Sequence, residues 1–262
     1  MSEGSGIGLT SILYLIILVQ LVTLAAIPLY IAFSGLSFSE KALRGFFESL
    51  MLSLVTSFPA TALVLAVSIP SGYVLSKMQG RTSRLLISLL ILPSALSPAA
   101  VGLILLLFFA TSPIGKLLDQ LVNVVNNVPG VVIAQFFIGL PIGINYYMSI
   151  FRTVPKELEE LALTMGYRSG EILMKILIPL RRNEVVAGGI LVFTRVFGDF
   201  GASLILGGGI MGRTTTLPIF LNYVMQLGEM SLLSLLLAMY VVLAFLMILF
   251  LLRLQEGGER HA

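Results

Sequence analysis

The sequence contains no cysteine and only one histidine among its 262 residues. The lack of cysteine excludes disulfide bonds and thiol chemistry. His261 belongs to the C-terminal tail, which excludes the ligand spacing of zinc peptidases and serine–histidine catalytic arrangements. A second membrane aspartate beside Asp199 is also missing, so the paired carboxylates of an aspartyl protease are excluded. We therefore expect no catalytic residue, no bound cofactor and no metal site in this chain.

Charged residues are also scarce, at 11% of the chain, whereas about 25% is usual in a soluble domain. Hydrophobic residues make up 57%, and the mean hydropathy is +1.02. The apolar residues fall in six runs, each long enough for a membrane helix of about 20 residues. Their approximate limits are Ile7 to Phe33, Phe46 to Ser76, Leu85 to Ala110, Val128 to Phe151, Val185 to Gly207 and Met230 to Leu252.

Two features favour helices over a membrane β-barrel. Lipid forces the backbone to satisfy its own hydrogen bonds, and the period-two alternation of an outer-membrane barrel is absent. We predict an all-α membrane protein with six transmembrane helices in a single domain over residues 1–262. The first run lacks a preceding basic region and an A-x-A site, so we expect it to be retained. Kinks or broken helices are expected at the prolines inside the runs, Pro59, Pro70, Pro93, Pro98 and Pro141.

The basic residues predict the orientation. With the N-terminus in the cytoplasm, eleven basic residues fall in inside loops or tails and four fall in outside loops. This distribution follows the positive-inside rule and predicts that both termini are cytoplasmic. The net charge of +3 is explained by topology, and no basic-aromatic face indicates nucleic-acid binding.

The longest predicted inside segment, residues 152–183, carries many charges. Its first part has apolar residues at the spacing of one helix face, Leu158, Leu161, Ala162 and Met165, and Gly166 is placed to end that helix. A second short helix is expected from Ser169, with Pro179 stopping it. From periodicity alone, a helix resting on lipid headgroups and a helix docking on a protein remain equally open.

The same segment resembles the signature of ABC importer permeases, E-A-A-x3-G-x9-I-x-L-P. The matching residues are Glu160, Ala162, Gly166, Ile176 and Pro179, while Leu161 and Ile178 replace an alanine and a leucine of the pattern. In that family this segment is the coupling helix, which inserts into a cleft of a cytoplasmic ATPase subunit. The resemblance therefore implies that residues 152–183 form a cytoplasmic coupling segment and that these five residues take part in ATPase coupling.

The resemblance covers most of the chain and is weakest in the first run. The stretch FGDFGASLILGGGIMGRTTTLPIFLNYV, residues 197–224, is similar to molybdate-type permeases, with Asp199 replacing the usual glutamate and Ser203 the usual threonine. This implies a type I ABC importer permease fold and transport of a tetrahedral oxyanion such as molybdate or tungstate. The implied partners are a second copy of the chain, two cytoplasmic ATP-binding subunits and an external substrate-binding protein. ATP would be bound by the partner subunit, and the location would be a prokaryotic inner membrane.

Arg195, Asp199 and Ser203 lie in the fifth run and are candidates for lining the pathway. Because Arg195 and Asp199 are four residues apart, they share a helix face, and charged groups in a membrane usually face a bundle interior. Two interpretations remain open: a structural ion pair, or a pathway in which the arginine attracts an oxyanion. The nearby GGGIMGRT, residues 207–214, approximates a P-loop but lacks its lysine, so we expect an external linker there.

Two other classes of membrane protein are alternatives to an ABC importer. A secondary transporter or channel would need no ATPase and often shows inverted repeats, which we do not find. A membrane scaffold would show no substrate-dependent stimulation of a partner ATPase. Within the importer class, the alternative substrates are sulfate or thiosulfate, followed by phosphate or polyamine.

Overall fold

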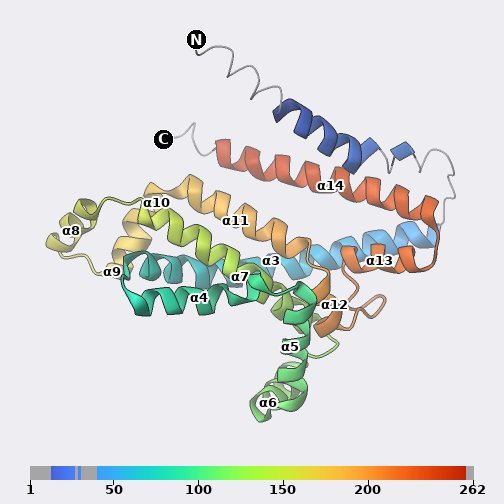
Figure 1. The fold of residues 1–262 in the computed structure, drawn as a ribbon, viewed down its shortest axis with the longest axis horizontal. Helices are drawn as coiled ribbons and strands as arrows, with labels where there is room; N and C mark the ends of the chain where they lie inside the picture. The colour runs from blue at the N-terminus through green and yellow to red at the C-terminus, as the bar shows by residue number, and fades with distance from the viewer. Residues whose placement is uncertain (1–12, 27–28, 31–39, 258–262) are drawn as a thin grey trace. The chain divides into compact units, whose positions relative to one another are not determined.

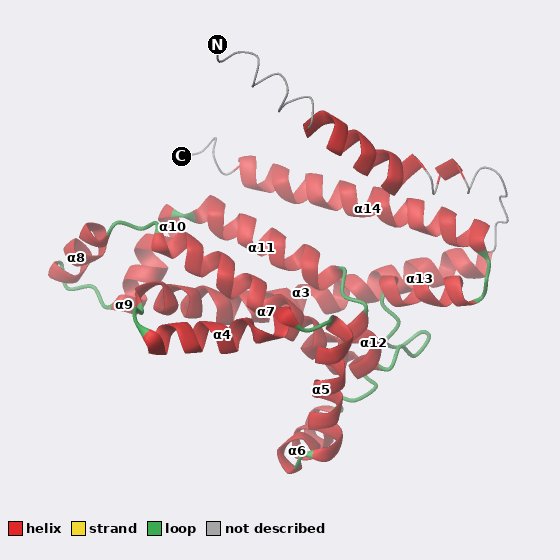
Figure 2. Cartoon of the chain, viewed as in Figure 1, coloured by secondary structure: helices red, strands yellow, loops and turns green. Residues whose placement is uncertain are grey.

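The computed structural model describes residues 13–26, 29–30 and 40–257 of the chain. Within these residues the regular elements are helices, and no strand occurs among them (Figure 2). The predicted all-α fold class is confirmed. The first predicted run lies only partly within the described residues, which contain an apolar helix, Leu13–Leu24, and the π-helical turn η1, Val22–Ala26.

Three continuous helices are long and apolar enough to cross a membrane. They are α3, Glu40–Lys77, α7, Val128–Arg152, and α14, Met230–Gly257, whose apolar span is Met230–Phe250. They correspond to the second, fourth and sixth predicted runs. Pro59 and Pro70 lie inside α3, and Pro141 lies inside α7.

Two further runs are bent pairs of helices. The third run consists of α4, Arg81–Ala95, and α5, Pro98–Thr111, which meet at an angle of 106°. Ser97 is extended at this break, as the residue before a proline prefers, and its hydroxyl accepts a hydrogen bond from the N–H of Ala100. The break expected at Pro98 is therefore present. The fifth run consists of α11, Arg182–Phe197, and α12, Gly201–Gly207, bent by 58°.

The chain divides into two compact units. One unit comprises residues 1–46 and 220–250, and the other comprises residues 47–219 and 251–262. The first unit includes most of α14 and part of α13, Leu217–Gln226. In this unit Gly45 allows close packing, because a Cβ there would lie 2.7 Å from the ring of Phe220.

Helix α7 is the central element of the larger unit. It packs against α4, α5, α11 and α12 (Figure 1). Its glycines permit close approach, because a Cβ on Gly139 would lie 2.8 Å from Val196 and one on Gly143 would lie 2.7 Å from the Ser68 hydroxyl. Membrane helices associate through such small residues because lipid gives little hydrophobic drive between them.

A row of buried hydroxyl groups runs along α3. Ser53 accepts a hydrogen bond from the N–H of Leu217 at 2.7 Å, and the Gln135 amide of α7 donates to Ser57 at 3.4 Å. These bonds satisfy polar groups that lipid would leave unpaired, and they hold α3 to distant parts of the chain. The buried hydroxyl residues of α3 are Ser49, Ser53, Thr56, Ser57, Thr61 and Ser68.

The segment between α12 and α13 was expected to be an external linker, but its second half is buried. Thr214, Thr215 and Thr216 are at most 2% exposed. Thr214 accepts a hydrogen bond from the N–H of Ile210 at 2.8 Å, and Thr215 donates to the carbonyl of Gly209 at 3.2 Å. The predicted linker covers residues 207–214, so Thr214 is its last residue and the other two threonines follow it. The hydroxyls of Thr214 and Thr215 pair with the backbone of the turn and allow it to fold inward, whereas the Thr216 hydroxyl is buried without a hydrogen-bond partner.

A further short helix of the larger unit is α6, Pro113–Val122. The Ser112 hydroxyl accepts from the N–H of Gly115 at its start, and one Asp119 oxygen accepts from the N–H groups of Val124 and Val125 after its end. Both ends of α6 are therefore capped by side chains.

Candidate functional site

The predicted coupling segment is a chain of short helical stretches at one end of α7 and α11 (Figure 1). It consists of α8, Lys156–Thr164, α9, Ser169–Glu171, the π-helix η2, Ile172–Leu177, and α10, Ile178–Leu180. The sequence therefore correctly predicted two helical stretches separated by a turn at Gly166.

Gly166 ends α8 in the left-handed conformation, with φ of +90°. Its N–H donates to the carbonyl of Leu163 at 3.0 Å, and the N–H of Tyr167 donates to the carbonyl of Ala162 at 3.1 Å. This is the hydrogen-bond pattern of a Schellman cap, which favours glycine at this position. A Cβ on Gly166 would meet no atom within 4 Å, so the turn presents open backbone at the surface.

The segment has an inner face that packs on the bundle. Ala162, Ile172, Leu173 and Leu177 are buried in one hydrophobic cluster. The cluster also includes Tyr73 of α3, Tyr147 and Phe151 of α7, and Val154 just after the end of α7. Burial of these groups fixes the segment against the ends of both helices.

The exposed side chains of the segment, together called its outer face, include apolar ones. Leu161, Leu163 and Met165 are 60%, 52% and 69% exposed, and Met174 is 65% exposed. The predicted face through Leu158, Leu161, Ala162 and Met165 is therefore only partly buried in this chain. Leu158 and Ala162 pack inward, but Leu161 points elsewhere because it is one residue from Ala162, or about 100° around the helix. Met165 is the C-cap residue, where the chain leaves the helix.

The five predicted coupling residues differ in exposure. Glu160, Gly166 and Pro179 are exposed, whereas Ala162 is buried and Ile176 is partly buried in the hydrophobic cluster. Pro179 does not stop the second helical stretch as predicted. It lies in the first turn of α10, where its missing N–H is tolerated, and the stretch ends at Arg181 with φ of −110°.

Several charges of the segment pair with one another. Glu171 accepts from the Lys175 ammonium at 2.8 Å and from the N–H of Arg168 at 3.0 Å. The bond to Lys175, followed by that to Arg168, lowers the pKa of Glu171, and the same pair raises the pKa of Lys175. Arg181 donates to Glu184 at 2.8 Å and to the Thr153 hydroxyl at 3.3 Å, which connects the segment to the start of α11.

Charge also joins the segment to α3. Lys77, the last residue of α3, donates to Glu159 of α8 in an ion pair that the sequence analysis did not predict. No local pattern indicates this pair, because 81 residues separate the two partners in the chain.

The second candidate site is the break between α11 and α12. Asp199 and Ser203 are completely buried, and Arg195 is partly exposed. One Asp199 oxygen accepts from the N–H of Ser203 at 2.9 Å and from its hydroxyl at 2.7 Å. The other oxygen is buried without a hydrogen-bond partner. In the described part of the chain, Arg195 and Asp199 form no ion pair within 4.0 Å. The carboxylate thus caps α12 and fixes the bend.

Small residues hold this break against α5. A Cβ on Gly102 would lie 2.9 Å from the Cα of Ala202, and one on Gly201 would lie 2.8 Å from the N of Ala99. The start of α12 is therefore positioned by backbone contact with the start of α5.

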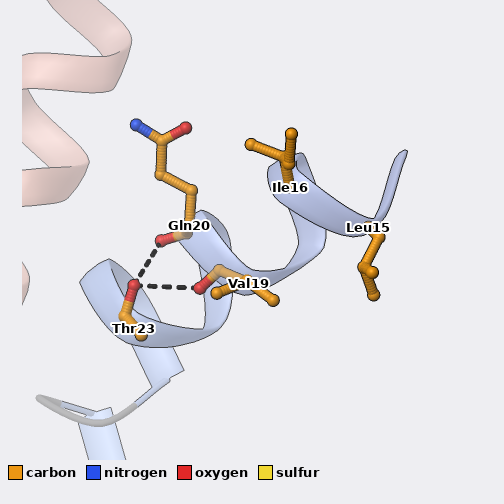
Figure 3. Close-up of a pocket in the computed structure, with 5 residues that line it drawn as sticks. All are labelled: Leu15, Ile16, Val19, Gln20 and Thr23. Carbon is orange, nitrogen blue, oxygen red and sulfur yellow. Dashed lines mark hydrogen bonds between the residues drawn. The ribbon is translucent and has the colours of Figure 1, made fainter. Parts of the chain in front are cut away.

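Two other features of the described chain bear on the binding of a metal ion or an anion. Among the residues that the structure describes, no group of three His, Cys, Asp or Glu side chains is arranged to hold a metal ion. Figure 3 shows a hollow on the first helix, lined by Leu15, Ile16, Val19, Gln20 and Thr23. The Thr23 hydroxyl bonds to carbonyls of its own helix, and no charged group lines the hollow, so it offers nothing to an anion.

Sequence relatives of the chain are permeases. The "Molybdenum transport system permease protein ModB" of Mycobacterium tuberculosis is 35% identical over 205 residues, which cover 77% of this chain and 76% of the relative. The "Sulfate transport system permease protein CysW" of Synechocystis is 30% identical over 181 residues, covering 68% of this chain and 66% of the relative.

Solved structures show the same fold. A bacterial alginate ABC transporter, in complex with an alginate pentasaccharide-bound periplasmic protein, contains a chain that matches with a TM-score of 0.71 at 13% identity. The match covers 96% of each chain. Residues 67–259 match the family of binding-protein-dependent transport system inner membrane components. With most of its length matched and a relative at 35% identity, this chain belongs to that family of multi-pass inner membrane proteins.

Proposed function

We propose that this chain is the translocation subunit of an ATP-driven importer for a tetrahedral oxyanion, with molybdate or tungstate as the substrate. The observation that carries the proposal is the 35% identity with a molybdenum permease over 77% of the chain. Such a chain would form one permease domain over residues 1–262. It would bind no nucleotide and catalyse no covalent step, because ATP would be hydrolysed on a partner subunit.

The proposed assembly has two copies of this chain, two cytoplasmic ATP-binding subunits and an external substrate-binding protein. The outer face of the coupling segment suits contact with the ATPase. It combines exposed Leu161, Leu163 and Met165 with exposed Glu160 and the open turn at Gly166. An apolar centre with a polar rim is typical of protein interfaces. The excess of basic residues in the loops on this side supports a cytoplasmic location for the segment and for both termini.

Transport would follow alternating access between two states of the complex. Closure of the ATPase pair would draw the coupling segments together and open the external side, and nucleotide release would restore the inward-open state. Arg195 is the candidate to attract the oxyanion, because it is partly exposed and no carboxylate neutralises it within 4.0 Å in the described part of the chain. Asp199 and Ser203 would shape the pathway by fixing the bend rather than by contacting the substrate.

Sulfate or thiosulfate is the second candidate substrate, because the sulfate permease of Synechocystis is 30% identical. A secondary transporter is disfavoured by the same relatives, which belong to binding-protein-dependent systems.

The test is uptake of labelled molybdate into proteoliposomes that contain this chain with its ATPase and binding protein. We expect uptake that requires ATP and the binding protein and that persists in excess sulfate. If sulfate competed as strongly as molybdate, sulfate would be the proposed substrate instead. Uptake that proceeds without ATP would overturn the importer proposal.

A further inference from the structure

The coupling helix α8 has little hydrophobic anchorage of its own. Ala162 is the only buried residue among its nine, and its methyl group offers a small contact area. Leu158 is partly buried, but Leu161 and Leu163 are exposed. A helix held so loosely would rotate or slide when a partner pushes on its outer face, since stiff transmission requires contacts with few alternative arrangements.

The ion pair between Lys77 and Glu159 supplies a second attachment. It joins α8 to the end of α3, which is not adjacent to α8 in the sequence. The Glu159 side chain is only 13% exposed and that of Lys77 is 34% exposed. Partial burial reduces screening by water, so such a pair holds its geometry better than an exposed one.

Aromatic side chains support the pair from the bundle side. The Lys77 ammonium lies 5.4 Å from the centre of the Tyr73 ring, within the range of a cation–π contact. Tyr73 packs edge-on against Phe151 of α7, with ring centres 5.7 Å apart. The contacts therefore run without interruption from α8 to α3 and then to α7.

We infer that Lys77 and Glu159, supported by Tyr73, are positioning residues that fasten the coupling helix to the second membrane span. Through them, a movement imposed on α8 displaces α3 together with α7. This role rests on the proposed function, in which α8 receives the movement from an ATPase. It gives two adjacent glutamates different roles: Glu159 pairs with α3, whereas Glu160 is exposed and can contact a partner.

Charge neutralisation and charge exchange test the role in the reconstituted complex. Lys77→Met and Glu159→Gln should each leave co-purification of the ATPase unchanged and lower the molybdate transported per ATP by about fivefold or more, in the range of typical coupling energies. The double exchange Lys77→Glu with Glu159→Lys should recover part of the ratio, because it restores the ion pair but not the cation–π contact with Tyr73. An unchanged ratio in both single variants, or no recovery in the exchange, would overturn the inference.

A second measurement does not depend on transport. Because the chain has no cysteine, Leu163→Cys on the exposed side of α8 accepts one nitroxide label without removing any native thiol. In the full chain in lipid nanodiscs, Glu159→Gln should increase the mobility of this label, and the exchange of both charges should restore it. Glu157→Gln is the matched control, since Glu157 is exposed on the same helix and should leave the mobility unchanged. Equal mobility in Glu159→Gln and the parent would refute the fastening even if transport fails for another reason.

Discussion

Ser203 donates two hydrogen bonds to one carboxylate oxygen of Asp199, from its backbone N–H and from its hydroxyl. The two residues face each other across the bend between α11 and α12. The Asp199 carboxylate is thus hydrogen-bonded to a neighbouring residue of the same chain. In the described part of the chain, Arg195 forms no ion pair with it within 4.0 Å. The two charged residues therefore have separate roles to test.

Asp199→Asn should fold and assemble normally, because the amide oxygen still accepts the bond from Ser203 N–H. Asp199→Leu removes the cap and should lower the free energy of unfolding by about 1–2 kcal/mol. Thermal unfolding in detergent measures both. If the asparagine variant were as unstable as the leucine variant, the negative charge rather than the cap would hold the bend.

Arg195→Gln should reduce molybdate uptake several-fold with normal assembly, since a partly exposed cation in a membrane favours passage of an anion. Arg195→Lys keeps the charge and should retain most of the uptake. The measurement is initial uptake in proteoliposomes at equal protein content. Wild-type uptake in the glutamine variant would show that Arg195 does not contribute to the pathway.

Gly166→Leu should insert into the membrane normally but fail to bind the ATPase. Its φ of +90° costs a residue with a Cβ about 1–2 kcal/mol, and the new side chain would occupy the open surface of the turn. Co-purification of the ATPase with the tagged permease provides the measurement. Gly170→Leu, where a Cβ also meets nothing within 4 Å and φ is not positive, is the control. If the Gly166→Leu variant bound the ATPase as well as the parent does, Gly166 would not belong to the docking surface.

Gly102→Ala should destabilise the protein by about 1–3 kcal/mol, because the added methyl would meet the backbone of Ala202, which cannot move aside cheaply. Gly189→Ala is the matched control. Its Cβ would lie 3.5 Å from Leu65, an ordinary contact, so its unfolding temperature should stay close to that of the parent. The difference between the two unfolding temperatures is the measurement. Equal temperatures would mean that α5 and α12 are not in close contact.

The Glu171–Lys175 ion pair should stabilise the coupling segment over a defined pH range. The pKa of Glu171 is lowered, so its contribution is complete above its ordinary value of 4.5 and is lost as the pH falls through the lower folded value. The pKa of Lys175 is raised, so its contribution is complete below 10.5 and is lost as the pH rises through the higher folded value. Between these limits the contribution of the pair to the stability of the segment is complete and should not change with pH.

Lys175→Gln should raise the pKa of Glu171 and still leave it below the ordinary value, because the N–H of Arg168 continues to donate. A carboxyl carbon NMR titration in micelles would show this, with Glu171→Gln identifying the resonance. A Glu171 pKa that did not change on Lys175→Gln would show that Arg168 alone is responsible.

Much of the fold could be predicted from the sequence because the bilayer imposes strong local rules. Run length located the helices, Pro98 located a break, and Gly166 located a left-handed cap. These signals depend on residues that are adjacent in the chain. The exposure of Leu161 and Met165 could not be predicted, because a nine-residue helix has too few turns to define its buried face.

The contacts of the candidate sites depend on distant partners. Lys77 meets Glu159, and Ser53 meets the N–H of Leu217, across long stretches of chain. One signal for the second contact was present: Ser53, Ser57 and Thr61 recur every four residues, which marks a polar stripe in an apolar run. No comparable signal marks Glu159, since α8 carries three other charged residues.

The π-helix η2 affects how many residues the coupling segment can hold. A helix with i to i−5 bonding contains one more residue per turn than the α-helix that would replace it. Removing one residue from Ile172–Leu177 would let this turn close with α-helical bonding, and the residues after it would keep their direction. Removing one residue from a regular α-helix would instead rotate everything after it by about 100°. The wide turn therefore lets the coupling segment hold one additional residue without turning the start of α11 away from its neighbours.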